Sequence, residues 1–137
     1  MQDPKGIEEL KRIKIGGIDQ GLHIRGRNRN NPVLLYLHGG PAASLWPWIG
    51  LLDAVQRPWE DFFTVAQWDQ RGGGKSYYPA SDETDLPTVE RFIADTEEVM
   101  QFLRRHLNQD KLFVLGHSWG SVLGMHMLKR HPDWFHA

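Results

Sequence analysis

Short runs of apolar residues, separated by glycines and polar turn residues, alternate with longer amphipathic stretches along this 137-residue chain. Residues 11–15 and 21–27 lie on either side of a pair of glycines, which predicts two short strands joined by a turn. Residues 33–37 and 62–66 are continuous apolar runs of the kind that is buried on both faces of a parallel sheet. The first half of the chain therefore contains four predicted strands.

Helices are expected between and after these strands. Residues 44–56 have helical character, whereas the Gly-, Pro- and Asp-rich residues 69–88 predict a long loop. Apolar residues recur every three or four positions from 92 to 107, which predicts an amphipathic helix. A strand over 111–115 and a helix over 121–130 complete the pattern. This alternation predicts an α/β domain with a mostly parallel sheet and helices on both faces.

The composition is that of one ordinary globular domain covering residues 1–137. Hydrophobic residues make up 40% and charged residues 24% of the chain, and the net charge of −1 gives no basic excess for nucleic acid or an anionic membrane surface. Cysteine is absent, which excludes disulfides and a thiolate nucleophile. Residues 1–10 lack the apolar core of a signal peptide, and no run approaches the about 20 apolar residues of a membrane span. We therefore expect a cytoplasmic protein without nucleic-acid or membrane partners.

The pentapeptide GHSWG, residues 116–120, has the pattern of a nucleophile elbow. It lies between a predicted strand and a predicted helix, so Ser118 is expected in a sharp, strained turn with its hydroxyl exposed. Gly116 and Gly120 are expected where side chains would collide with the neighbouring strand and helix, and Gly124 is expected to keep the helix slim against the sheet. The competing interpretation is a turn of small residues that only joins strand to helix.

A second motif, His38-Gly39-Gly40-Pro41, follows the strand predicted over 33–37. A pair of glycines there lets the backbone present an N–H without a side chain in the way. Acyl transfer needs two such donors for the developing oxyanion, and we assign them to the N–H groups of Gly40 and Trp119. His38, Gly39 and Pro41 are candidate substrate contacts from the same loop. His38 is either a base or a local brace of the loop, and the brace is favoured.

A third motif, residues 68–76, follows the strand predicted over 62–66. Its end, Gly-Lys-Ser, invites interpretation as a phosphate-binding loop, but that pattern needs a glycine where this chain has Asp69. A nucleotide site is therefore excluded. Asp69 and Arg71 are expected to tie the loop into a turn beside the site.

In their order and spacing, the three motifs resemble the proline iminopeptidase branch of the α/β-hydrolase fold, from about residue 12 to the end of the chain. The resemblance implies the N-terminal half of such a domain, with Ser118 as nucleophile. It also implies a serine hydrolase that removes an N-terminal residue, often proline, or cleaves related amides and esters. No cofactor and no metal are expected. One departure is Ala42, where the family pattern usually has glycine after the proline.

The resemblance also implies that the acid and the histidine of the triad follow a later cap domain. Four titratable residues follow Ser118 in this chain, and each must be considered as a possible base or acid of the triad. By the helix rise, His126 is about 12 Å and His131 about 20 Å from Ser118, and Asp133 and His136 lie farther away. We therefore expect no complete triad in this chain and a requirement for the C-terminal half of the hydrolase.

Without the next strand, residues 111–115 would form an exposed apolar edge, which recruits a partner strand or aggregates. The chain is therefore predicted to be one half of a split, proteolysed or truncated hydrolase that needs the other half to fold stably, with pairing of two copies as the alternative. His23 and His106 are expected at the surface. Two further possibilities remain: a non-catalytic binding module on a hydrolase scaffold, and a degenerate product without function.

Overall fold

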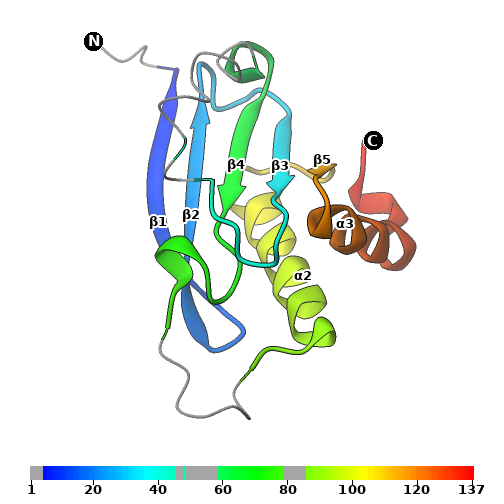
Figure 1. The fold of residues 1–137 in the computed structure, drawn as a ribbon. Helices are drawn as coiled ribbons and strands as arrows, with labels where there is room; N and C mark the ends of the chain where they lie inside the picture. The colour runs from blue at the N-terminus through cyan, green and yellow to red at the C-terminus, as the bar shows by residue number, and fades with distance from the viewer. Residues whose placement is uncertain (1–4, 46–47, 49–58, 79–85) are drawn as a thin grey trace.

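Five strands form one sheet in the computed structural model, which describes residues 5–45, 48, 59–78 and 86–137. Their order across the sheet is β1-β2-β4-β3-β5 (Figure 1). The strands span β1 Ile7–Ile15, β2 Ile18–Gly26, β3 Val33–Leu37, β4 Thr64–Trp68 and β5 Phe113–Gly116. The expected strands are all present, and β3 has the bounds that its apolar run predicts.

The sheet is mixed rather than mostly parallel. β1 pairs with β2 and β2 with β4 in antiparallel register, whereas β3 pairs in parallel with both β4 and β5. The hairpin between β1 and β2 turns at Gly16 and Gly17, whose φ angles of 54° and 84° favour glycine. The α/β fold class is confirmed, and its parallel part is the β4-β3-β5 half of the sheet.

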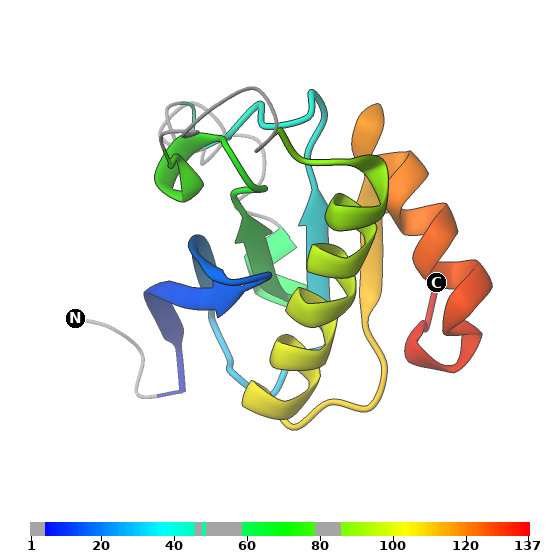
Figure 2. The ribbon, with the colours of Figure 1, turned by 90° about the horizontal axis from the view of Figure 1, so that it is seen from below.

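Two long helices, α2 (Val89–His106) and α3 (Trp119–Arg130), lie side by side on one face of the sheet (Figures 1 and 2). Thr88 caps α2, since its hydroxyl accepts the N–H of Arg91 at 3.1 Å. The helix expected over 44–56, which would cover the other face, lies almost entirely outside the described residues. Within the described part of the chain, no helix is long and apolar enough to cross a membrane.

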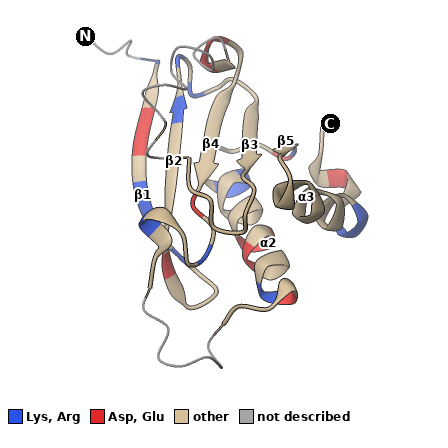
Figure 3. Ribbon diagram, viewed as in Figure 1, with Lys and Arg blue, Asp and Glu red and all other residues tan. Residues whose placement is uncertain are grey.

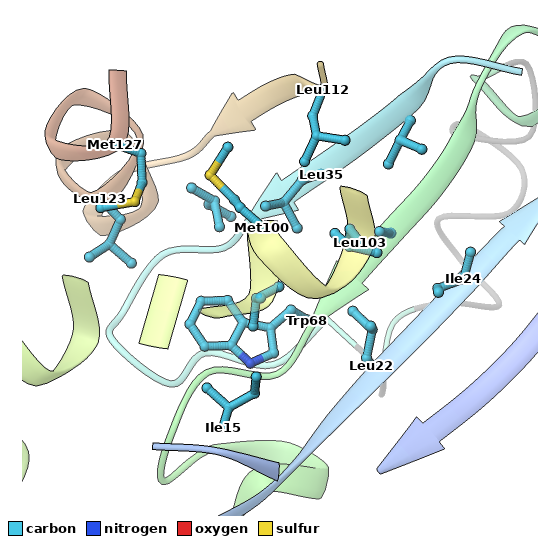
Figure 4. Packing of buried hydrophobic residues seen from close by; sticks show 14 of the residues in the cluster. Ile15, Leu22, Ile24, Leu35, Trp68, Met100, Leu103, Leu112, Leu123 and Met127 are labelled. Carbon is cyan, nitrogen blue, oxygen red and sulfur yellow. The ribbon is translucent and has the colours of Figure 1, made fainter. Parts of the chain in front are cut away.

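One apolar core fills the space between this face of the sheet and the two helices. Trp68 of β4 lies among side chains from β1, β2 and α2, and α3 adds Leu123 and Met127 at one end (Figure 4). Alternate residues of β3 point into this core, as the period of two in a strand requires. The core therefore holds α2 and α3 at a fixed position relative to the ends of the parallel strands.

Four expectations need correction. The strand expected over 62–66 begins two residues later, because residues 59–62 are helical and leave Phe62 69% exposed. The loop expected over 69–88 contains a short 3₁₀ helix, η2 (Gly74–Ser76), and its residues 79–85 are outside the described part. His23 is buried, at 6% exposure, because it lies on the central strand β2. His106 is half-buried and pairs with Glu9 at 2.6 Å.

β5 lies at the edge of the sheet, as expected for the strand before the elbow. Residues 134–137, which begin at the last residue of the 3₁₀ helix η4 (Pro132–Trp134), run along the outer side of β5. Leu112 donates its N–H to the carbonyl of Trp134 at 2.8 Å and accepts the N–H of His136 at 2.9 Å. Leu115, farther along, remains 40% exposed. The edge is therefore covered at its start and open near the elbow.

Candidate active site

The three sequence motifs meet at one end of the sheet. They follow β3, β4 and β5, which run parallel, so their carboxyl ends lie at the same edge. β3 sits between the other two, and the chain therefore leaves β3 in one direction to form β4 and crosses back past β3 to form β5. Ligands of open α/β sheets bind at such a reversal of strand order. The topology thus places the second motif and the elbow side by side.

Ser118 adopts the strained backbone of an elbow, with φ 52° and ψ −120°, immediately before α3. The residue is exposed. A side chain at Gly116 would lie 2.7 Å from the carbonyl oxygen of Gly120, and one at Gly120 would overlap the carbonyl of Leu37. Both glycines are therefore required by the close approach of strand and helix, as the sequence predicts.

Gly124 does not have the role expected of it. A methyl group there would lie 3.8 Å from Val114 Cγ1 and 3.9 Å from Leu37 Cδ1, which are ordinary contact distances. The helix has already diverged from the sheet at this point, so this position has room for alanine.

The loop after β3 lies directly against the elbow. A Cβ on Gly39 would be 3.1 Å from the Cβ of Ser118, a tight contact that favours glycine at this position. Gly40 has a φ of 119°, which also favours glycine. Within the described residues, neither the N–H of Gly40 nor that of Trp119 donates a hydrogen bond to the protein. Both N–H groups are therefore available as donors, one directly after the glycine that packs on Ser118 and one directly after Ser118 itself.

Ala42 has a φ of 66°, the left-handed conformation that glycine adopts most easily. This gives a physical reason for the glycine that the family pattern has at this position. Gly73 of the third motif packs against Ala42 so closely that a Cβ on Gly73 would lie 2.8 Å from the Ala42 Cβ. The second and third motifs are thus in direct contact.

His38 is a brace of the loop in its hydrogen bonding. Its ring is 2% exposed; Nε2 accepts the backbone N–H of Gln70 at 3.1 Å and Nδ1 lies 2.8 Å from the carbonyl oxygen of Gly39. Because Nε2 is an acceptor, the proton resides on Nδ1 and is donated to Gly39. Burial lowers the pKa of His38 against the opposing effects of the Gly39 carbonyl and of Asp69, which keeps the ring neutral.

Asp69 closes the turn that the sequence predicts for it. Its carboxylate accepts the N–H of Lys75 at 2.8 Å and the hydroxyl of Ser44 at 2.6 Å, and its carbonyl accepts the hydroxyl of Ser76. The hydroxyl of Ser76 in turn accepts the N–H of Gly21 on β2 at 2.8 Å. The third motif is therefore tied to both the sheet and the loop after β3.

Arg71 anchors the same loop to α2 through a buried ion pair. Its guanidinium donates to both carboxylate oxygens of Asp95, at 2.8 and 3.1 Å, and to the carbonyl of Gly16 at 2.9 Å. Asp95 is fully buried and also accepts from Gln20 at 2.9 Å and from Arg91 at 2.8 Å. Such a fully bonded buried pair is costly to break, because one charge would be left unpaired.

No described histidine or carboxylate forms a hydrogen bond with the Ser118 hydroxyl. His131 pairs with Glu97 at 3.0 Å, and His136 stacks on Phe113 with ring centroids 4.8 Å apart. His126 lines a hollow on α3 together with Met125. Among the described residues, no group of three or more His, Cys, Asp or Glu is placed to hold a metal ion. Among the described residues, Ser118 is therefore exposed and has no histidine or carboxylate bonded to its hydroxyl.

An apolar groove of about 270 Å³ runs beside the elbow, between β5, α3 and residues 135–137. Met125 and Leu128 line it and are 65% and 43% exposed, and Val122 beside them is 41% exposed. The charges of α3 are confined to its last turn, so the rest of the helix presents an uncharged surface (Figure 3). This surface is contiguous with the open part of the β5 edge.

Two residues of the site are missing from the sequence-based candidates. Gln70 is fully buried beside His38, and its signal is its position two residues after the end of β4. Asp95 also carries a signal, because it lies on the apolar stripe of α2, three residues from Phe92 and four from Val99. An acid in that stripe needs a partner, but sequence alone does not identify Arg71 as that partner.

Comparison with known proteins gives one family. Residues 32–137 match the protein family described as alpha/beta hydrolase fold. The probable aminopeptidase YbaC of Bacillus subtilis (strain 168) is 42% identical over 135 residues, which are 98% of this chain and 41% of the relative. The probable proline iminopeptidase of Leptolyngbya boryana is 35% identical over 111 residues, covering 77% of this chain and 30% of the relative. The chain thus spans less than half the length of these relatives.

Solved structures of similar fold agree with this family assignment. A proline iminopeptidase-related protein from Thermus thermophilus has a TM-score of 0.72 at 27% identity, over 93% of this chain and 42% of that protein. An epoxide hydrolase from Vigna radiata has a TM-score of 0.70 at 22% identity, over 95% of this chain and 38% of that protein, which shows the fold alone. With the elbow, the loop after β3 and the sheet order, these likenesses show that the chain belongs to the α/β-hydrolase family and is proline iminopeptidase-like.

Proposed function

We propose that this chain carries the nucleophile and the oxyanion hole of a serine hydrolase that cleaves N-terminal prolyl peptide bonds or related amides and esters. The observation that carries the proposal is the strained, exposed Ser118. The N–H groups of Gly40 and Trp119, which have no partner among the described residues, support it. The named activities of the relatives support the substrate class, since they include aminopeptidase and proline iminopeptidase.

In the proposed reaction, the Ser118 hydroxyl oxygen attacks the substrate carbonyl carbon while a base takes its proton. The negative charge that develops on the carbonyl oxygen is held by the N–H groups of Gly40 and Trp119, at the positive end of α3. The C–N or C–O bond then breaks, and the leaving group departs with the proton from the base. Water hydrolyses the resulting acyl-enzyme by the same steps in reverse order and frees Ser118. Gly39 and Pro41 would contact the substrate from the loop.

The base and its acid are proposed to come from polypeptide outside residues 1–137, namely the C-terminal half of the hydrolase. The described residues offer Ser118 no base, and the groove along α3 offers an apolar surface beside the elbow. The open edge of β5 can pair with a further parallel strand, in the direction that residues 134–137 already follow. We therefore expect the chain alone to be inactive.

Labelling with a fluorophosphonate probe tests this function. The chain mixed with its C-terminal half should be labelled and should hydrolyse a prolyl arylamide, whereas the chain alone should do neither. Ser118→Ala should abolish both signals, and Ser121→Ala should still be labelled, which assigns the label to Ser118. Absence of labelling in the reconstituted protein would remove the proposal.

A second candidate is a non-catalytic binding module on the hydrolase scaffold. It is favoured by one observation, that no described histidine or carboxylate is bonded to Ser118. A binding module gains nothing from a strained serine between two free donors. The reconstituted protein separates the two, because a binding module would retain an unlabelled Ser118 in the presence of its partner.

A further inference from the structure

Gln70 lies between the loop after β3 and the third motif, with its side chain fully buried. We propose that Gln70 is a positioning residue that holds the backbone of Gly39 and Gly40 against Ser118 by binding His38. The inference rests on the proposed function, because it concerns the oxyanion hole of that same site. Gln70 itself would touch neither substrate nor reacting atoms.

Two hydrogen bonds carry the inference, and both end on His38. The backbone N–H of Gln70 donates to His38 Nε2 at 3.1 Å, and the side-chain amide donates to the His38 carbonyl oxygen at 2.8 Å. The second bond fixes the peptide plane between His38 and Gly39, since that carbonyl belongs to it. One glutamine therefore holds both the ring and the backbone of the residue where the loop begins.

From His38 the restraint passes directly to the nucleophile. The ring donates from Nδ1 to the Gly39 carbonyl, which also accepts the N–H of Ala43 at 3.2 Å. Gly39 in turn lies against Ser118, since a Cβ on Gly39 would be 3.1 Å from the Ser118 Cβ. A shift of the His38 peptide would thus move Gly39 and the N–H of Gly40 relative to Ser118.

The two ends of the Gln70 side-chain amide differ, since the N–H is bonded to His38 and the oxygen is not bonded among the described residues. Its amide oxygen is buried and has no hydrogen-bond partner in the described structure. Leaving a buried acceptor unsatisfied costs about 1–3 kcal/mol, and the side chain accepts this cost at its oxygen while its N–H satisfies the buried carbonyl of His38. A glutamine kept at such a cost is expected where its donor group performs a specific task.

Gln20 provides a matched control. It is also a fully buried glutamine that donates from its side-chain amide, but to Asp95 and to the Ile15 carbonyl. Its oxygen is satisfied by the indole N–H of Trp68 at 2.9 Å. Gln20 therefore supports the fold without touching the loop after β3, and Gln20→Met should lower stability without changing the geometry of the oxyanion hole.

The test compares Gln70→Met and Gln20→Met in the reconstituted hydrolase, with an ester substrate, below the unfolding temperature of both variants. Gln70→Met should lower kcat about 100-fold and leave KM within about twofold, because a displaced donor weakens the transition state more than the bound substrate. Gln20→Met should lower the unfolding temperature and leave kcat within about twofold. Equal kcat in Gln70→Met and the unmodified protein would overturn the inference.

A second readout does not depend on activity. With ¹⁵N-glycine in this chain only, the amide resonances of Gly39 and Gly40 should move in Gln70→Met and stay in place in Gln20→Met. Unchanged resonances in Gln70→Met would contradict the positioning role even if no substrate were turned over. Absence of all hydrolysis and labelling, with the resonances moving as expected, would instead remove the proposed function and retain the structural role of Gln70.

Discussion

Ala42 holds a backbone conformation that a side chain disfavours, at the point where the second motif turns toward residue 44. Its φ of 66° places the Cβ near the following carbonyl, which costs an L-residue about 1–2 kcal/mol. The methyl group also lies against Gly73. The loop is therefore held in place by its neighbours and not by its own preference, which agrees with its close packing against the third motif.

Replacing Ala42 by glycine should relieve this strain. We expect Ala42→Gly to raise the free energy of unfolding by about 0.5 kcal/mol, because the relief exceeds the extra chain entropy that glycine brings to the unfolded state. Ala43→Gly is the matched control, since Ala43 has no positive φ and should lose about 0.5–1 kcal/mol. Urea denaturation of the reconstituted protein measures the free energy of unfolding of both variants. If both substitutions lowered it, the strain at Ala42 would be contradicted.

At the level of elements, the position of Ser118 depends on how closely α3 approaches β3. The first turn of α3 touches the carbonyl of Leu37 at Gly120, and the helix has moved away from the sheet one turn later, at Gly124. Two glycines on the same helix face, four residues apart, therefore have different roles. Only the first is needed to keep Ser118 at the end of β5 and beside the loop after β3.

Alanine at these two positions should have opposite effects. Gly120→Ala should destabilise the protein by about 2–4 kcal/mol and displace Ser118, because the methyl overlaps a backbone carbonyl. Gly124→Ala should stabilise it by about 0.5–1 kcal/mol, since alanine is a better helix former and the space is free. Urea denaturation measures the change in stability, and the rate of fluorophosphonate labelling measures the displacement of Ser118. A destabilising Gly124→Ala would show that the approach of helix and sheet is closer than described.

The sequence predicts the features that neighbouring residues determine, and it does not predict contacts between residues that are distant in the chain. The apolar run of β3, the period of α2 and the elbow are local signals, and the structure has these elements where those signals lie. The start of β4 differs from the predicted start because Phe62 ends a helical turn, although its apolar character suits a strand. The role of Gln70 depends on His38, 32 residues earlier, and no local sequence pattern indicates a contact between the ends of two strands.

Across the whole molecule, Glu9 joins three parts that are distant in sequence. Its carboxylate on β1 accepts from Arg29, in the turn before β3, at 2.9 Å and lies 2.6 Å from His106 Nε2 at the end of α2. Burial alone would raise the pKa of Glu9, but the hydrogen bonds from His106, Arg29 and Lys11 outweigh it and lower the pKa to about 2. The ionised form is thus the one that the folded protein favours.

This contact should give the protein a defined acid sensitivity. A carboxylate with a pKa of about 2 when folded and near 4.5 when unfolded contributes stability above pH 4.5, which is lost as the pH falls toward 2. Glu9→Gln should therefore lose about 1–2 kcal/mol at pH 7, and its stability should fall less than that of the unmodified protein between pH 4.5 and 2. Asp19→Asn, at an exposed position of β2, is the control and should follow the unmodified protein.

The sheet order has a consequence for how the protein is made. β3 leaves a synthesising ribosome before β4, and β4 pairs with one of its edges, but the other edge must wait for β5, which follows only after all of α2 has been made. During that interval β3 presents an unpaired apolar edge, of the kind that joins the strands of other chains. The edge that finally receives β5, the strand before Ser118, is thus exposed during synthesis, and a chaperone that binds it would protect a part of the candidate active site.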